Sequence, residues 1–279
     1  MKRIGVTGSG GFIGKNLIPA LKNDHYDVLE ISRSNGIDII NWKSLENLPK
    51  CDVIIHLAAK TFVPDSLKDP AEFYRFNTQS TIHALELSRK WNAKMIFMSS
   101  YLYGVPLYIP VDETHPLSPH NPYAESKLIS EQLCKAYCRD FGIKVLAFRL
   151  FNLYGPGQAG SFLIPEILEK IKTGRLVLKD PRPKRDYIHI FDVIRALIKA
   201  IEWNWENFEI LNLATGDAVS VETIVNHFLE LTNNGFEVEY TNEYRKGEVL
   251  ESVGDPKKLK EVLGISDLVR IREGIITLL

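Results

Sequence analysis

Short apolar runs alternate with amphipathic stretches through the first half of the chain. The apolar runs span residues 3–8, 27–32, 52–59, 94–100 and 144–150. They contain few polar positions, which is typical of parallel strands that are covered on both faces of a sheet. Between them, the pattern predicts helices at 12–23, 70–91 and 122–141. This alternation predicts an α/β fold built on a doubly wound parallel sheet.

The regular alternation ends near Tyr154, where a glycine-rich and then a proline-rich loop follow. We expect residues 187–215 to return to the first sheet, and the remaining segments to form a smaller C-terminal α/β lobe. The predicted domains are therefore residues 1–154 with 187–215, and residues 155–186 with 216–279.

Charge and cysteine content exclude several classes of protein. Lys and Arg number 34 against 35 for Asp and Glu, a net charge of -1, so no global field would attract nucleic acid or an anionic membrane. No apolar run approaches the roughly 18 residues needed to span a bilayer. Three cysteines without a signal peptide favour a reducing, cytoplasmic location, with the thiols buried and no metal site.

The segment TGSGGFIG, residues 7–14, follows the first predicted strand and opens the first helix. Gly8, Gly11 and Gly14 would permit a tight turn and a close approach of the backbone to a pyrophosphate. The following helix, beginning with Phe12 and Ile13, would offer its N-terminal N–H groups to the phosphates. The position of this loop predicts dinucleotide binding and a Rossmann sheet.

The end of the second predicted strand bears on the choice between NAD and NADP. Enzymes that bind NAD usually carry an acid here for the adenosine ribose, but this position holds Ser32, followed by Arg33. A hydroxyl and a guanidinium suit the 2′-phosphate of NADP. Glu30 is an alternative ribose acceptor in a shifted register. We therefore favour NADP(H), with NAD(H) as the alternative.

Tyr123 and Lys127 stand four residues apart in NPYAESK, so they are neighbours on the predicted helix. Such a pair arises often by chance, and the rest of the chain decides its meaning. Further segments share a common pattern with it: HLAAKT (56–61), FNTQST (76–81), SSYLYG (99–104), RLFNLYGPGQ (149–158), KRDYIHIFDV (184–193) and RKGEV (245–249). Together with the glycine loop, they make the chain resemble the extended short-chain dehydrogenase/reductase family of nucleotide-sugar epimerases, dehydratases and reductases.

The resemblance implies that Tyr123, Lys127 and Ser99 are catalytic, with Ser100 as a second candidate for the serine. A free tyrosine titrates near ~10, so we expect the Lys127 ammonium and a cationic nicotinamide to lower its pKa. Tyr123 would then exchange a proton with a sugar hydroxyl, and the serine would hydrogen-bond the reacting oxygen.

The same resemblance implies contacts for the cofactor and the substrate. The implied cofactor residues, besides those of the glycine loop, Ser32 and Arg33, are Asp38, Ile39, Leu57, Ala58, Ala59, Thr61, Asn77, Tyr123 and Lys127. The implied substrate residues are Ser99, Ser100, Tyr101, Asn152, Arg185 and Arg245. The substrate would be a nucleoside diphosphate sugar whose base and sugar stay open.

The reaction is narrowed by two positions after Ser99. Dehydratases of this family carry an Asp-Glu pair where this chain has Ser100 and Tyr101, so dehydration is disfavoured. We lean towards a 4-keto-(6-deoxy)hexose reductase, with a 4-epimerase as the alternative and a non-catalytic NADP sensor as a distant third reading. The resemblance also implies a homodimer, formed as a four-helix bundle through residues 70–91 and 122–141.

Overall fold

The contacts within the chain divide it into two units. The structure is a computed structural model that describes residues 1–232, 235–244 and 249–279. Unit 1 contains Met1–Gly104, Pro116–Leu150 and Ile194–Leu211. Unit 2 contains Val105–His115, Phe151–Val193 and Asn212–Leu279. Whether these units correspond to the predicted domains stays a prediction.

A six-stranded sheet forms the centre of unit 1. Its strands are β1 (Arg3–Thr7), β2 (Asp27–Ile31), β3 (Val53–His56), β4 (Lys94–Ser100), β5 (Val145–Leu150) and β9 (Phe208–Leu213). The spatial order is β2-β1-β3-β4-β5-β9, and the pairs from β2 through β5 are parallel. The chain order reverses between β1 and β3, and ligands of doubly wound sheets bind at such a switch point, beyond the carboxyl ends of the strands. The predicted α/β fold class is confirmed.

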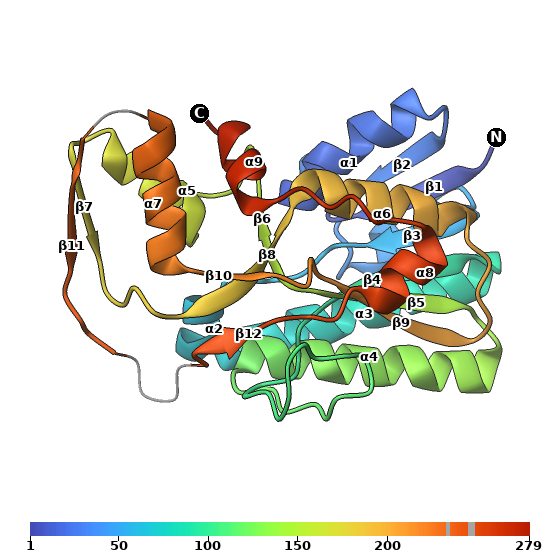
Figure 1. Ribbon diagram of the computed structural model, residues 1–279. Helices are drawn as coiled ribbons and strands as arrows, with labels where there is room; N and C mark the ends of the chain where they lie inside the picture. The colour runs from blue at the N-terminus through green and yellow to red at the C-terminus, as the bar shows by residue number, and fades with distance from the viewer. Residues whose placement is uncertain (233–234, 245–248) are drawn as a thin grey trace. The chain divides into compact units, whose positions relative to one another are not determined.

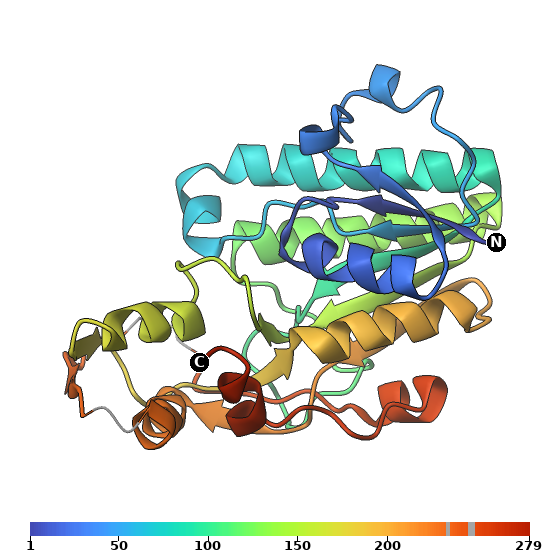
Figure 2. The same cartoon turned by 90° about the horizontal axis from the view of Figure 1, so that it is seen from above.

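Helices cover both faces of this sheet. Figure 2 shows α3 (Pro70–Trp91) and α4 (Pro122–Phe141) on one face, with α1 (Phe12–Asn23) and α6 (Ile190–Glu202) on the other. The bounds of α1, α3 and α4 agree with those predicted from the sequence. Shorter helices are α2 (Val63–Lys68) and the single 3₁₀ turns Arg33–Asn35 and Trp42–Ser44.

The start of α4 is fixed by its first residues. The Asn121 side chain accepts a 2.9 Å hydrogen bond from Ala124 N, and Pro122 occupies the first helical position. An Asn cap with a following proline is a strong start signal, because the cap satisfies an N–H that has no partner within the helix. Tyr123 is therefore held in the first turn, and Lys127 and Glu131 follow at one-turn intervals on the same side.

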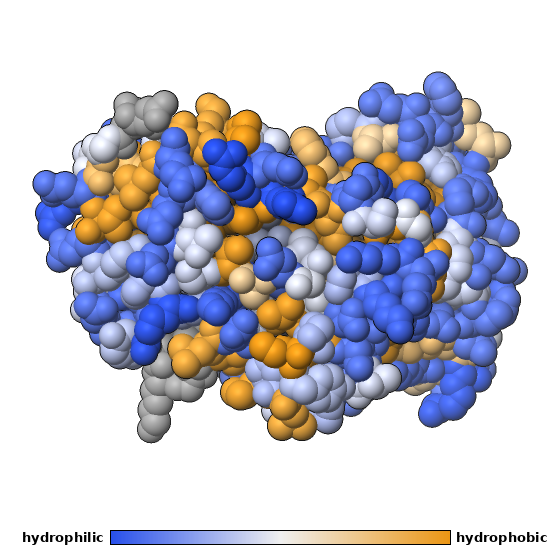
Figure 3. Space-filling model, in the orientation of Figure 1, coloured by the Kyte–Doolittle hydropathy of each residue, from blue (hydrophilic) through white to orange (hydrophobic). Residues whose placement is uncertain are grey.

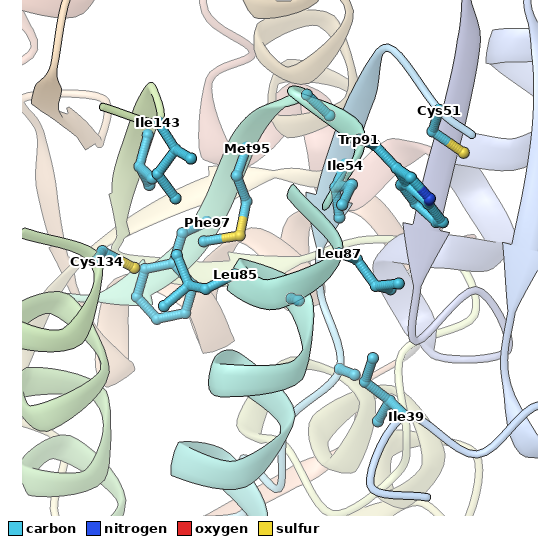
Figure 4. Close-up of a cluster of buried hydrophobic side chains, with 14 of the residues drawn as sticks. Ile39, Cys51, Ile54, Leu85, Leu87, Trp91, Met95, Phe97, Cys134 and Ile143 are labelled. Atoms are coloured by element: carbon cyan, nitrogen blue, oxygen red, sulfur yellow. The ribbon is translucent and has the colours of Figure 1, made fainter. Parts of the chain in front are cut away.

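The core between the sheet and the pair α3 and α4 is a continuous apolar cluster. Figure 4 shows Met95 and Phe97 of β4 among Leu85 of α3, Cys134 of α4 and Ile143. All three cysteines are free and buried, as expected, and burial raises the pKa of each thiol. Their role is therefore packing, because a buried thiol that stays protonated is a poor nucleophile and a poor ligand.

Unit 2 is built on two smaller sheets. Its strands are β6 (Asn152–Tyr154), β7 (Arg175–Leu178), β8 (Lys184–His189), β10 (Ala218–Ser220), β11 (Glu237–Tyr240) and β12 (Glu251–Ser252). β8 is the central strand of one sheet and pairs with β6, β10 and β12, while β7 pairs with β11. Its helices are α5 (Leu163–Ile171), α7 (Val221–Thr232), α8 (Lys257–Leu263) and α9 (Ile271–Ile276). Figure 1 labels these elements.

One strand expectation needs correction. Residues 208–213 join the large sheet as β9, but residues 187–189, which were expected there too, belong to β8 in the second sheet. The apolar run YIHIF spans the end of β8 and the start of α6, so its hydrophobicity reflects burial in two elements rather than membership of the first sheet.

The exposed residues of the two predicted bundle helices do not identify a dimer contact. Phe76, Leu133 and Tyr137 belong to the two helices expected to form the bundle, and they are half-buried and pack on the cluster of unit 1. Exposed apolar side chains gather instead in the loop at Val105, Leu107 and Ile109, and Figure 3 shows apolar groups at the lower edge, where this loop lies in Figure 1. The homodimer stays a prediction.

Within the described part of the chain, no helix combines the length and apolar character needed to cross a bilayer.

Candidate active site

The glycine loop has the geometry needed to hold a pyrophosphate. Gly8 has φ +69°, and a Cβ there would lie 2.7 Å from Ala58 N, so only glycine lets this loop approach the loop after β3. A Cβ at Gly14 would lie 2.5 Å from Ser9 O. The cap residue Gly11 provides no side-chain hydrogen bond to the first turn of α1. Ser9 Oγ is buried and has no partner among the described residues, so the loop offers donors that a dinucleotide phosphate would satisfy.

The loop after β3 is fixed to this region by Thr7 and Asn77. Leu57 N and Ala58 N each donate a 3.2 Å hydrogen bond to Thr7, to its backbone O and its Oγ1 respectively. Asn77 Oδ1 accepts from Lys60 N at 2.8 Å, and Asn77 Nδ2 donates to Lys60 O at 3.1 Å. The loop that contains Ala59 and Thr61 therefore has its backbone held on both sides.

Two hydroxyls and a guanidinium follow the end of β2. Ser32 Oγ lies 2.8 Å from Ser34 Oγ, and Arg33 between them is exposed. A Cβ at Gly10 would lie 3.0 Å from Ser34 Oγ, so these hydroxyls lie against the glycine loop. Glu30, the alternative ribose acceptor, is instead paired with Lys22 Nζ at 2.8 Å, and that hydrogen bond lowers the pKa of its carboxyl.

Asp38 and Ile39 lie in the loop beyond this turn. The Asp38 carboxylate accepts from Ile40 N at 3.2 Å, and Ile39 is buried in the same cluster as Ala58. Ile39 O is 2.6 Å from His83 Nδ1 of α3. Ile39 is therefore held against α3, and Asp38 precedes it in the same loop.

Tyr123 is hydrogen-bonded to the Ser100 side chain, and Lys127 Nζ donates to Met98 O at 2.7 Å. Burial raises the pKa of Tyr123 to about 12, although the Ser100 hydrogen bond acts in the opposite direction. Burial lowers the pKa of Lys127 to about 8. The expectation that Lys127 and a bound nicotinamide together lower the pKa of Tyr123 stays a prediction; in the chain without cofactor, burial penalises the phenolate more strongly than its neighbours stabilise it.

Ser99 and Ser100 have different partners. Ser99 Oγ donates to Glu131 Oε1 at 2.6 Å, whereas Ser100 meets Tyr123. Both partners belong to α4, and Glu131 lies two helical turns after Tyr123, so the two hydroxyls meet different turns of the same helix. Tyr101 follows with its backbone N donating to Leu150 O at 3.1 Å, and its side chain lies close enough to influence the pKa of Tyr123.

A buried ion pair behind Ser99 was missed in the sequence. Arg149 of β5 donates to both Glu131 oxygens, with N···O distances of 3.1 and 2.9 Å, and both side chains are almost completely buried. Arg149 Nη1 also donates to Tyr103 Oη at 3.2 Å. The available signal was the spacing of Tyr123, Lys127 and Glu131 at four-residue intervals, which places three polar groups on one side of a helix that packs against a sheet.

His56 of β3 lies at the centre of a buried hydrogen-bond chain. Its Nδ1 is 2.7 Å from Thr7 Oγ1, and its Nε2 is 3.2 Å from Thr81 Oγ1. Thr81 Oγ1 donates to Asn77 O at 2.8 Å. Burial lowers the pKa of His56 to about 3, and the charge of Lys127 makes a smaller contribution in the same direction. The imidazole is therefore neutral, and it accepts one hydrogen bond while it donates the other.

The predicted substrate residues Asn152 and Arg185 both line a pocket in unit 2. The pocket has a volume of about 510 Å³ and also contains Lys170, Lys179 and Tyr187. Asn152 Nδ2 donates to Asp186 O at 3.1 Å, and Arg185 Nη1 donates to Lys184 O at 3.0 Å. Apolar side chains of α5, β7 and α7 form further parts of the wall, which is the usual make-up of a small-molecule site. Arg245, the third predicted substrate contact, lies outside the described residues.

The described residues contain no group of three or more His, Cys, Asp or Glu side chains that could hold a metal ion.

Comparison with known sequences identifies the family. Residues 4–214 match the model of the NAD dependent epimerase/dehydratase family. The chain is 34% identical to a putative UDP-glucose 4-epimerase of Methanocaldococcus jannaschii, covering 97% of this chain and 95% of that protein. It is 28% identical to a GDP-6-deoxy-D-mannose reductase of Pseudomonas aeruginosa, covering 98% and 95%.

Solved structures give the same result. RMD from Pseudomonas aeruginosa complexed with NADPH matches with a TM-score of 0.90 at 27% identity, covering 99% of this chain and 96% of that one. The UDP-glucose 4-epimerase of Thermotoga maritima with UDP-glucose matches with a TM-score of 0.91 at 28% identity, covering 99% and 96%. The Thermus thermophilus UDP-glucose 4-epimerase complex with NAD matches with a TM-score of 0.86 at 26% identity, covering 99% and 98%.

The chain belongs to the NAD dependent epimerase/dehydratase family, whose members are NAD(P)-dependent nucleotide-sugar epimerases, reductases and dehydratases. The resemblance inferred from the sequence motifs is confirmed, as is the prediction of an enzyme of this class.

Proposed function

We propose that the chain is an NADP(H)-dependent reductase that converts a nucleoside diphosphate 4-keto-(6-deoxy)hexose to the corresponding alcohol. The observation that carries this proposal is the hydrogen bond between Tyr123 and Ser100, with Lys127 one helical turn further along α4. Burial raises the pKa of Tyr123 to about 12, so the phenol is protonated at neutral pH. A protonated phenol is the form that a ketone reduction requires, because it has to give up its proton.

The residues of the chain have separate roles in this reaction. NADPH, when bound, supplies the hydride that reduces the C4 ketone. Tyr123 donates its proton to the sugar oxygen as negative charge develops there, and the Ser100 hydroxyl stabilises the same charge. Lys127 stabilises the phenolate left behind, which then regains a proton from water. The hydride and the proton together account for the two hydrogens of the new alcohol.

The cofactor would be held by unit 1. Gly8, Gly11, Gly14 and the first turn of α1 would bind the pyrophosphate, and the loop of Leu57, Ala58, Ala59 and Thr61 would line the nucleotide. Asn77 would brace this loop. These assignments rest on the close approach of Gly8 to Ala58 and on the buried hydroxyl of Ser9.

The residues expected to bind the adenosine end of the cofactor favour NADP(H) over NAD(H). The paired hydroxyls of Ser32 and Ser34 and the exposed Arg33 supply donors suited to a 2′-phosphate. Glu30 is occupied by Lys22, which weakens the case for a ribose acceptor of the NAD type. The neighbour from Pseudomonas aeruginosa binds NADPH, and the one from Thermus thermophilus binds NAD.

The pocket in unit 2 would take the nucleotide of the substrate. Arg185 and Asn152 supply donors for a diphosphate, and the apolar walls suit a flat base. The similarity to proteins of nucleotide-sugar metabolism supports this assignment.

A 4-epimerase is the second candidate, favoured by the 34% identity to a putative UDP-glucose 4-epimerase. An epimerase would use the same Tyr123 first as base and then as acid, and would show no net consumption of cofactor. A non-catalytic sensor would have little use for Ser100, Tyr123 and Lys127 together.

The test is an assay of NADPH absorbance with dTDP-, UDP- and GDP-linked 4-keto-6-deoxyhexoses, with the products separated by chromatography. Loss of NADPH equal to the alcohol formed is the expected result. Interconversion of UDP-glucose and UDP-galactose without net loss of cofactor would replace the reductase by the epimerase. Absence of both activities in folded protein that binds NADPH would favour the sensor.

A further inference from the structure

The Lys127 amine is buried between a backbone carbonyl and an aromatic ring. It is 4% exposed, and its Nζ donates a 2.7 Å hydrogen bond to Met98 O. The same Nζ lies 4.9 Å from the centroid of the Phe97 ring, within the range of a cation–π contact. Met98 and Phe97 are consecutive residues of β4, so one short piece of strand supplies both contacts.

The Phe97 ring is itself held in place. It stacks on His56 of β3, with ring centroids 5.8 Å apart and an angle of 19° between the planes. His56 is fixed by Thr7 and Thr81 through its two nitrogens. Figure 4 shows the other surroundings of Phe97, which are apolar side chains such as Leu85 and Cys134. The ring therefore has little freedom to turn its face away from Lys127.

We propose that Phe97 is a positioning residue for the active site: the face of its ring, together with the Met98 carbonyl, keeps the Lys127 amine charged and in place one helical turn after Tyr123. This inference rests on the proposed role of Lys127. It assigns a function to a residue that the sequence presents only as part of an apolar strand.

The charges around Lys127 explain why the contact with Phe97 affects the protonation of the amine. Burial lowers the pKa of Lys127 to about 8, while Glu131 and Cys134 of α4 act in the opposite direction. Glu131 is already paired with Arg149 of β5, and His56 of β3 is neutral. Tyr123, one turn earlier, is protonated. The charged amine is thus close to losing its proton in the physiological range, and the quadrupole of an aromatic ring is a stabilising contact that an aliphatic residue cannot replace.

The pKa of Lys127 can be measured directly, without substrate or cofactor. Protein labelled with ¹³C at the lysine side chains would be titrated by NMR, and the Lys127 signal assigned by its loss in Lys127→Met. We expect Phe97→Leu to lower the pKa of Lys127 by roughly one unit, because the cation–π stabilisation of a desolvated amine is of that size.

Two further variants separate this effect from loss of packing. Phe148→Leu is the matched control, since Phe148 is equally buried in the adjacent strand β5 and is the register partner of Met98. It should leave the pKa of Lys127 unchanged. Phe97→Tyr keeps the aromatic face and should keep the pKa near that of the original protein. Thermal unfolding of each variant establishes that the titrated protein is folded.

The sign of the shift decides the proposal. If Phe97 acted only by excluding water, Phe97→Leu would hydrate the amine and raise its pKa, and that result would overturn the inference, as would an unchanged value. Because the titration uses no substrate, its outcome is independent of the assay of reductase activity. A lowered pKa without reductase activity would leave the contact established and remove only its proposed catalytic purpose.

Discussion

Ser99 Oγ donates a 2.6 Å hydrogen bond to Glu131 Oε1, and Glu131 in turn forms a buried ion pair with Arg149. The resemblance to known enzymes favours Ser99 as the catalytic serine, whereas the structure joins Ser100 to Tyr123. The two serines thus have different physical roles available to them. Ser99 completes the hydrogen bonding of a buried carboxylate, and Ser100 is in reach of the phenol that would transfer the proton.

Alanine substitutions at the two serines should therefore differ in kind. Ser100→Ala should lower kcat by about 10²–10³-fold with little change in stability, since it removes a donor to the developing charge. Ser99→Ala should cost about 1–3 kcal/mol of unfolding free energy, because Glu131 loses a buried donor, and should lower kcat much less. Steady-state kinetics and denaturant unfolding of both variants measure this. A larger loss of kcat in a well-folded Ser99→Ala protein would return the catalytic role to Ser99.

Tyr123→Phe should lower kcat by about 10²–10⁴-fold, the usual contribution of a positioned acid, with a much smaller effect on the affinity for NADPH. Tyr137→Phe is the matched control. Tyr137 lies on the same helix and donates a hydrogen bond to Glu86 at 2.9 Å, but it packs at the edge of the core cluster. Rates and fluorescence titrations with NADPH would be compared for the two variants. Full hydride transfer by Tyr123→Phe would rule out the catalytic assignment.

Arg33→Ala tests the preference for NADP(H). Loss of a guanidinium that binds the 2′-phosphate should weaken NADPH binding by about 10–100-fold and leave NADH binding unchanged, because NADH lacks that phosphate. Calorimetric titrations with both cofactors measure the ratio. The control is Arg139→Ala, which removes an exposed arginine paired with Asp140 at the end of α4. An equal loss for both cofactors would mean that Arg33 has another role.

The parts of the fold set by local pattern were predictable. The helix at 122–141 carries an Asn cap, a proline at its first position and a glycine after its end, so the sequence fixes its bounds. The glycine loop is recognisable for a similar reason, since steric limits at Gly8 and Gly14 leave no other residue type.

The parts of the site and the fold that depend on contacts between residues far apart in the sequence were not predictable. The choice between Ser99 and Ser100 depends on which turn of α4 each hydroxyl meets, and this follows from how the helix lies along the end of β4. The pairing of Glu131 with Arg149 depends on how closely α4 packs against β5, which the spacing along the chain does not express. The assignment of residues 187–189 to β8 likewise depends on its pairing with β6, β10 and β12, which lie far from it along the chain.

His56 gives a prediction about stability at acid pH. Burial and the charge of Lys127 lower its pKa to about 3, from an ordinary value near ~6.5. As the pH falls below the ordinary value, the unfolded chain gains a proton at His56 that the folded chain does not bind. The unfolding free energy should therefore decrease as the pH falls, by about 1.4 kcal/mol per pH unit between about pH 6 and 4 from this residue alone.

His56→Gln should remove that slope even though it lowers stability at neutral pH, where the contacts with Thr7 and Thr81 are lost. His189, whose pKa burial lowers to about 4, contributes in the same pH range, so His189→Gln should remove a comparable slope. His120→Gln, at an exposed position, is the control and should leave the profile unchanged. Denaturant unfolding at a series of pH values measures all three. If His56→Gln lost stability by the same amount at pH 4 and pH 7, the imidazole would be protonated inside the fold, and the hydrogen-bond chain from Thr7 to Asn77 would need a different arrangement of protons.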